Sequence, residues 1–147
     1  MKERLPTKRY KNITKLGVIT TPYGGTTTQE KFHPGIDIAN FNGTPIPAFE
    51  GGTVVKSENG HVQGENNFGN TAWIRDKNGN VHQYNHLNKS LVVPGQQVEK
   101  GQQIAEMGRS GAVYSPSKND PTNLDYRVVS AYGKYKSPLL YLSNFDK

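Results

Sequence analysis

The 147-residue sequence contains no cysteine, which excludes disulfide bonds and thiolate metal ligands. A metal site would therefore have to use histidine and carboxylate side chains. The sequence also has no apolar run near the roughly 18 residues of a membrane span. Its first segment, MKERLPTKRYKNITK, lacks the apolar stretch of a secretory signal. We expect neither a membrane span nor a signal peptide in this chain.

Helical periodicity of any length is missing as well. Instead, 16 glycines and 9 prolines separate short runs rich in Val, Ile, Thr and Tyr, which predicts an all-β fold in one domain. The expected strands are residues 16–21, 35–39, 52–57, 70–76, 81–86, 102–107 and 124–130. Within DKNGNV, the pair Asn78-Gly79 tolerates positive φ and predicts a tight hairpin turn.

The positive charge is concentrated at the N-terminus. Of a net charge of +6, five charges fall in residues 1–15, where six basic residues face one acidic residue. We therefore divide the chain into a basic arm, residues 1–15, and a domain, residues 16–147. Such an arm is typical of a solvated terminus, but it could also dock onto an anionic wall polymer, a virion or a multidomain partner. No aromatic-rich basic motif accompanies the arm, so nucleic acid is not an expected partner.

The segment HPGIDIA combines two side chains that can bind a metal ion. His33 precedes a Pro-Gly turn and Asp37 lies on the expected strand that follows. One chain reversal could aim an imidazole and a carboxylate at the same point, and zinc accepts both ligands. By itself, this spacing is more typical of a hydrogen-bonded pair that fixes a turn.

The segment VHQYNHL contains two more histidines. Alternate residues of a strand share a face, so His82, Tyr84 and His86 are predicted to point the same way. A histidine beside a metal ion could hold or move a proton near neutral pH. Without HPGIDIA, the same pattern would indicate a solvent-facing polar side of a hairpin.

Five segments occur in a characteristic order: TPYG, FHPGIDIA, GNTAWIRDKNGNVHQYNHL, VVPGQQVEKGQQIAEMG and TNLDYRVV. Together they resemble the lysostaphin-type (LytM-like) family of peptidoglycan zinc metalloendopeptidases over residues 19–129. The resemblance implies an antiparallel β-sandwich-like fold with a narrow groove, a Zn²⁺ site, and hydrolysis of cross-bridge or stem peptides in the bacterial wall. It assigns His33 and Asp37 as zinc ligands and His86 as a catalytic histidine. Loops 59–69 and 109–122 would select the substrate.

The last segment departs from the family pattern, in which a His-x-His pair supplies a catalytic residue and the third zinc ligand. Here those positions are Asn123 and Asp125. Asn123 can orient a group but cannot transfer a proton near neutral pH. Asp125 can bind zinc, but a His, Asp, Asp set cancels the charge of the ion. Arg127, two residues further on, could instead pair with Asp125, and such a pair is expected to remove the third ligand.

Two functions follow from the resemblance. The chain is either an active zinc endopeptidase or a pseudoenzyme that serves as a peptidoglycan-binding or assembly module. A phosphocarrier with paired histidines is disfavoured because Asn123 and Asp125 stand at the paired positions. The substrate lies outside the membrane, so we expect action at the bacterial cell wall. Delivery would be as a phage virion component or as part of a longer secreted protein.

Overall fold

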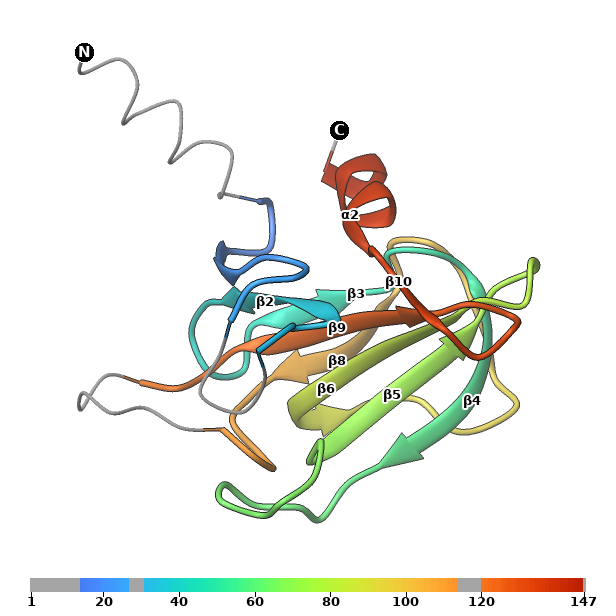
Figure 1. The fold of residues 1–147 in the computed structure, drawn as a ribbon. Coiled ribbons are helices and arrows are strands. Elements are labelled where there is room, and N and C mark those ends of the chain that lie inside the picture. Colours follow the sequence, from blue (N-terminus) through green and yellow to red (C-terminus); the bar gives the residue numbers. More distant parts are fainter. Residues whose placement is uncertain (1–13, 27–30, 114–119, 147) are drawn as a thin grey trace.

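The described part of the chain folds into antiparallel strands with one short helix, which confirms the all-β expectation (Figure 1). The structure, a computed structural model, describes residues 14–26, 31–113 and 120–146; residues 1–13 of the basic arm lie outside these ranges. Among the described residues, no helix is long and apolar enough to cross a membrane. The elements are β1 (Val18–Thr21), β2 (Gly35–Ala39), β3 (Pro45–Pro47), β4 (Gly52–Glu58), β5 (Asn70–Arg75), β6 (Val81–Ser90), β7 (Gln97–Val98), β8 (Gln103–Met107), β9 (Leu124–Val129), β10 (Tyr135–Lys136) and α2 (Leu139–Asp146).

The sheet runs in the order β1-β2-β9-β6-β5-β4-β7, and β6 connects it to a second group of strands. The first part of β6 pairs with β5 and β9, whereas its last residues pair with β8, which also pairs with β3. The register on β5 shifts here, because Ala72 faces Tyr84 but Asn70 faces Leu87. One extra residue of β6 is accommodated as a bulge, and His86 has a positive φ of 63°. The strand therefore changes course at His86.

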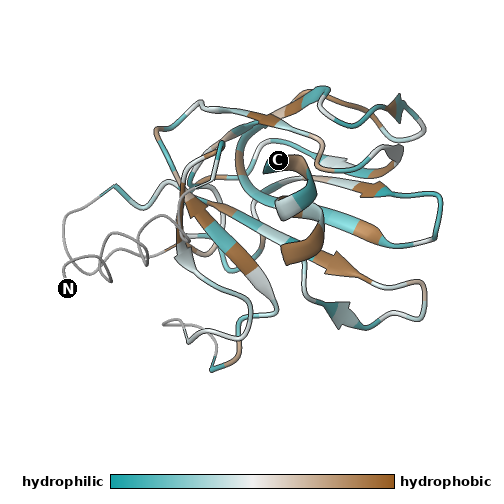
Figure 2. Ribbon diagram, turned by 90° about the horizontal axis from the view of Figure 1, so that it is seen from above, coloured by the Kyte–Doolittle hydropathy of each residue, from teal (hydrophilic) through white to brown (hydrophobic). Residues whose placement is uncertain are grey.

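The hydrophobic core lies against one face of β2, β9, β6 and β5. Phe49 packs on Tyr84 and Tyr126, with ring centroids 5.6 and 4.7 Å away. Helix α2 lies over the strands in Figure 2; its Leu142 is buried, and its Phe145 ring lies 5.2 Å from Phe49. Burying each such large side chain stabilises the fold by about 1.5–3 kcal/mol. The alternate residues of the same strands face the opposite side.

The predicted hairpin between β5 and β6 is confirmed. The Asp76 amide donates to the Asn80 carbonyl at 2.8 Å, and Gly79 has a φ of 85°. The Asp76 carboxylate also accepts hydrogen bonds from the amides of Asn78 and Asn80. This side chain therefore fastens the turn that the Asn-Gly pair makes possible.

Candidate metal centre and its histidines

Three polar residues stand side by side on the face opposite the core. Asp37 of β2 is directly opposite Asp125 of β9, and Asp125 is directly opposite Asn85 of β6. Directly opposed residues on antiparallel strands have side chains on the same face. Strand pairing therefore brings together two carboxylates that are 88 positions apart in the sequence.

The turn before β2 adds His33 to this row. The His33 amide donates to the Gly25 carbonyl at 2.8 Å, and the His33 carbonyl accepts from the Gly24 amide at 2.7 Å. The TPYGG segment thus holds the backbone of the HPG turn. Gly35 lets β2 approach β9, because a Cβ atom on Gly35 would lie 2.7 Å from the carbonyl oxygen of Tyr126.

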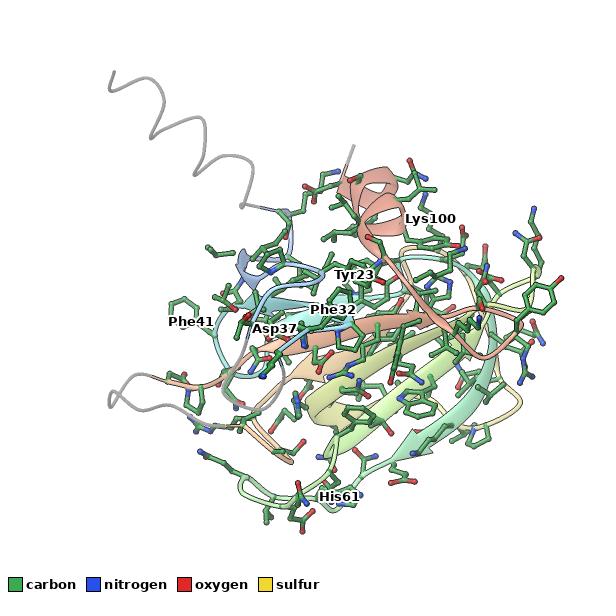
Figure 3. The ribbon with its side chains drawn as sticks, in the orientation of Figure 1. Tyr23, Phe32, Asp37, Phe41, His61 and Lys100 are labelled. Atoms are coloured by element: carbon green, nitrogen blue, oxygen red, sulfur yellow. The ribbon has the colours of Figure 1, made fainter. Side chains whose placement is uncertain are left out.

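His33, Asp37 and Asp125 form a cluster in which one ligand atom from each lies within 4.8 Å of the others. His33 Nε2 is 2.9 Å from Asp37 Oδ1 and 3.9 Å from Asp125 Oδ1. Figure 3 labels Asp37 on β2. Burial raises the pKa of the Asp37 carboxyl, and the negative charge of Asp125 raises it further, against the lowering effect of the His33 hydrogen bond.

The predicted pair between Arg127 and Asp125 forms. Arg127 Nε donates to Asp125 Oδ1 at 2.9 Å and Arg127 Nη2 donates to Oδ2 at 2.8 Å. The pair leaves Asp125 within the cluster, because Oδ1 still lies 3.9 Å from His33 Nε2. The loss of the third zinc ligand stays a prediction. A carboxylate oxygen has more than one lone-pair direction, so the same side chain can meet a guanidinium and a second partner.

His86 is the fourth member of the site. Its Nε2 lies 3.8 Å from Asp125 Oδ2, and its Nδ1 lies 2.8 Å from the carbonyl oxygen of Ser110. A carbonyl oxygen can only accept, so Nδ1 carries the hydrogen, and in the neutral ring Nε2 presents its lone pair towards the cluster. The His86 amide donates to the Phe68 carbonyl at 2.8 Å.

Ser110 and Phe68 hold His86, and the sequence analysis did not identify them. They belong to two segments that are interlocked by backbone hydrogen bonds, including Gly64 to the Gly111 carbonyl and Ala112 to the Asn67 carbonyl. Two glycines in the sequence could have indicated these segments, since Gly69 and Gly111 both have positive φ. Residues 114–119 of the predicted substrate-selecting loop lie outside the described residues.

The prediction that His82 and His86 share a face is wrong. His82 is fully buried on the core side, where Nε2 donates to Asp76 Oδ2 at 2.9 Å and Nδ1 lies 2.7 Å from the Tyr126 hydroxyl. The bulge at His86 breaks the alternation on which the prediction depended. His82 is therefore separated from the metal cluster by the sheet itself.

Asn123 immediately precedes β9 and lies two residues before Asp125 in the sequence. Its side-chain amide donates to the Pro121 carbonyl at 2.8 Å, and its backbone amide donates to the Gly108 carbonyl at 3.0 Å. These bonds fix the chain where it enters β9. An orienting role for Asn123 in a reaction remains a prediction.

The donor set suits a zinc ion. One imidazole nitrogen and two carboxylates are ligands that zinc accepts, and three protein ligands leave the open position typical of a catalytic site. His33 and Asp125 are 2% exposed. Burial, followed by the negative charge of Asp125, makes the ionised Asp37 carboxylate unfavourable, and a bound cation would offset both effects.

The chain is similar to proteins of one known family. The family model described as peptidase family M23 matches residues 31–136, which include His33, Asp37, His86 and Asp125. The chain belongs to peptidase family M23. This family membership and the structural likeness below confirm the resemblance to lysostaphin-type enzymes.

Two curated M23 relatives and one solved structure show the extent of the likeness. The chain is 39% identical over 108 residues to the lipoprotein NlpD/LppB homolog of Pseudomonas aeruginosa, covering 74% of this chain and 32% of that protein. It is 38% identical over 90 residues to the peptidoglycan DD-endopeptidase ShyC of Vibrio cholerae, covering 61% and 20%. The catalytic domain of lysostaphin from Staphylococcus simulans superposes with a TM-score of 0.66 at 25% identity, covering 88% and 92%. The chain thus spans a third or less of the length of both curated relatives.

Proposed function

We propose that the chain is a zinc-dependent endopeptidase domain that hydrolyses peptide bonds of bacterial peptidoglycan. The observation that carries the proposal is the cluster of His33, Asp37 and Asp125, with His86 Nε2 directed towards it. In this proposal the first three residues bind the zinc ion. When bound, zinc supplies the Lewis acidity that polarises a peptide carbonyl and activates water.

His86 is the proposed proton carrier. Its Nδ1 hydrogen is committed to Ser110, so the neutral ring can accept a proton from the attacking water only at Nε2. The same atom can return that proton to the leaving amine as the C–N bond breaks, which yields one carboxylate and one amine. Asn123 has no proton to exchange in this pH range, so its proposed role is to orient.

The proposed substrate class comes from the family and its relatives. The chain is similar to ShyC, whose name is peptidoglycan DD-endopeptidase, and to lysostaphin, described as an antimicrobial peptidase. We therefore place the action at the bacterial cell wall. Delivery as a phage virion component or within a longer secreted protein, with the basic arm docking to a partner, stays a prediction.

The test combines metal content with product analysis. Protein purified without added zinc should contain close to one zinc per chain, and it should release new amino groups from purified peptidoglycan. Asp37→Ala and Asp125→Ala should lose both the zinc and the amine release. A wild-type protein that takes up no zinc even when zinc is offered would overturn the proposal.

A second candidate function is a non-catalytic peptidoglycan-binding module. The specific observations that favour it are the Arg127 fork on Asp125 and the Asn123 side chain bonded to Pro121. In this reading the protein sediments with insoluble peptidoglycan but releases no amine. Sedimentation by a chelator-treated wild type at undiminished affinity, together with no hydrolysis by the zinc-loaded form, would favour the binding module.

A further inference from the structure

The side chain of Arg127 is held in place beside the metal cluster by several contacts. Its guanidinium grips Asp125 with two parallel hydrogen bonds of 2.9 and 2.8 Å, and the two side chains are only 6% and 3% exposed. The guanidinium carbon also lies 4.8 Å from the ring centroid of Phe68 and 5.6 Å from that of Tyr135. Fork-like pairing and stacking on aromatic faces both suit arginine and cannot be reproduced by lysine.

The neighbouring strand leaves room for this side chain. A Cβ atom on Gly35 would lie 2.6 Å from Arg127 Cγ and 3.1 Å from Asp125 Oδ1. The first contact is too short for real atoms and the second is tight, so a side chain at Gly35 would displace Arg127 and crowd Asp125. The glycine of HPGID therefore admits the ion pair as well as the close approach of the strands.

The charge of Arg127 changes the net charge of the metal centre. The carboxylates of Asp37 and Asp125 together cancel the charge of a divalent ion, whereas the guanidinium of Arg127 returns one positive charge to the centre. A set of one carboxylate and two neutral imidazoles leaves the same single positive charge around such an ion. Arg127 thus offsets the charge that distinguishes Asp125 from a histidine at this position.

We propose that Arg127 is a positioning residue that acts as an internal countercation of the metal centre. It holds Asp125 towards His33, stabilises the centre when no ion is bound, and limits the affinity of the centre for zinc. The inference rests on the proposed zinc binding by His33, Asp37 and Asp125. It adds Arg127 to the residues that the proposed function assigns to the metal centre.

A countercation and a structural residue predict opposite changes in zinc affinity. Without the guanidinium, Asp125 keeps a full negative charge and loses the partner that competes for its oxygens, so zinc should bind more tightly. A residue that only shapes the site should, when removed, leave zinc binding weaker or unchanged. The sign of the change therefore distinguishes the two roles.

The experiment uses the full chain as wild type, Arg127→Gln and Arg127→Lys, and two measurements. Zinc affinity is measured by competition with a chromophoric chelator, and the melting temperature is measured in excess EDTA. Arg127→Gln removes a positive charge next to the ion, so it should bind zinc about tenfold more tightly and, without metal, melt about 10 °C lower. Arg127→Lys keeps the charge but not the fork, so its zinc affinity should fall between the other two. If Arg127→Gln does not fold, Arg127→Lys decides, and zinc affinity equal to or weaker than wild type overturns the inference.

The outcomes for the two proposals can be told apart. Zinc binding by the wild type with unchanged or weaker binding by Arg127→Gln overturns the countercation and leaves the proposed function intact. Zinc binding by Arg127→Gln alone supports the countercation and overturns the wild type as a zinc enzyme. A failure of both folded proteins to bind zinc overturns both proposals.

Discussion

Two buried histidine–aspartate clusters lie on opposite faces of the same sheet, and their histidines are four residues apart on β6. On the core side, both ring nitrogens of His82 meet partners at hydrogen-bond distance, Asp76 and the Tyr126 hydroxyl. On the other side, His86 has one nitrogen fixed, while its Nε2 is 3.8 Å from Asp125. Both ring nitrogens of His82 are therefore used within the fold. His86 instead presents Nε2 to the carboxylates of the metal cluster.

The pKa values of the aspartates in the two clusters are shifted in opposite directions. For Asp76, burial raises the pKa, but hydrogen bonds from His82, Asn78 and Asn80 together lower it below the usual value. For Asp37, burial and the charge of Asp125 outweigh the hydrogen bond from His33, so the pKa is raised. A carboxylate stabilised by its neighbours indicates a structural cluster. A carboxylate destabilised by burial and by a nearby like charge indicates a site that gains from binding a cation.

The largest expected effect is on catalysis, from His86→Asn. Asparagine tolerates the positive φ at this position but cannot transfer a proton near neutral pH, so amine release should fall about a thousandfold. The rate is measured on purified peptidoglycan with zinc-loaded protein. Lys100→Gln is the control, because Lys100 is an exposed turn residue away from Asp37 (Figure 3) and should retain full activity. Undiminished hydrolysis by folded His86→Asn would remove His86 from the mechanism.

The next effect is on folding, from His82→Phe. The substitution leaves the Asp76 carboxylate and the Tyr126 hydroxyl without their buried partner, which should lower the free energy of unfolding by about 3 kcal/mol. Urea denaturation measures the loss. His86→Asn should lose about 1 kcal/mol or less by the same measurement. Equal losses in the two variants would contradict the distinction between the clusters.

The pH dependence of stability should also come from the core cluster. Burial lowers the pKa of His82, against the hydrogen bond from Asp76, which raises it. As the pH falls below about 6.5, the unfolded chain therefore gains a proton at this histidine before the folded chain does, and stability decreases. Asp76 does not oppose this loss, because its own contribution disappears only as the pH falls below the ordinary aspartate value.

Unfolding free energies at pH 7 and pH 5.5 test this contribution. The wild type should lose more stability between these two values than His82→Phe does. A variant that loses as much as the wild type would show that the dependence arises from other groups.

The smallest effect is expected from Asp37→Asn in chelator-treated protein. A raised pKa means that the folded chain holds the charged carboxylate less favourably than the unfolded chain does, so Asp37 destabilises the metal-free fold once it is ionised. Removing that charge should stabilise the fold by about 1 kcal/mol, or raise the melting temperature by about 4 °C. The same variant should bind zinc weakly. A lower melting temperature without metal would mean that the His33–Asp37 contact dominates.

Sequence patterns located the strands of four or more residues, because runs of β-branched residues between glycines and prolines mark strands at this length. The prediction ended β6 at residue 86, whereas the strand continues to Ser90. The strand at 35–39 agrees with β2 at both ends. The two- and three-residue strands β3, β7 and β10 are too short for any alternation to show. Helix α2 has eight residues and buries only Leu142, so it leaves no periodic signal either.

The candidate site was predicted in part: the HPGIDIA turn indicated His33 and Asp37, and the family resemblance supplied Asp125. His33, Asp37 and Asp125 were expected together, and strand register does bring them together. The position of His86 was reached by resemblance, while strand alternation predicted the wrong neighbour for it. A bulge with positive φ at a histidine has no sequence signature, whereas glycine at such a position would have shown it.

The interlocking of residues 62–70 with 108–112 limits how such a domain can be altered. Ser110 binds His86 through its carbonyl, while its hydroxyl bridges the Asn70 amide and the Leu87 carbonyl. The loops predicted to choose a substrate therefore also anchor the proposed proton carrier. Exchange of one loop alone between relatives should misalign the imidazole, so new specificities in this scaffold would have to be transplanted as a matched loop pair.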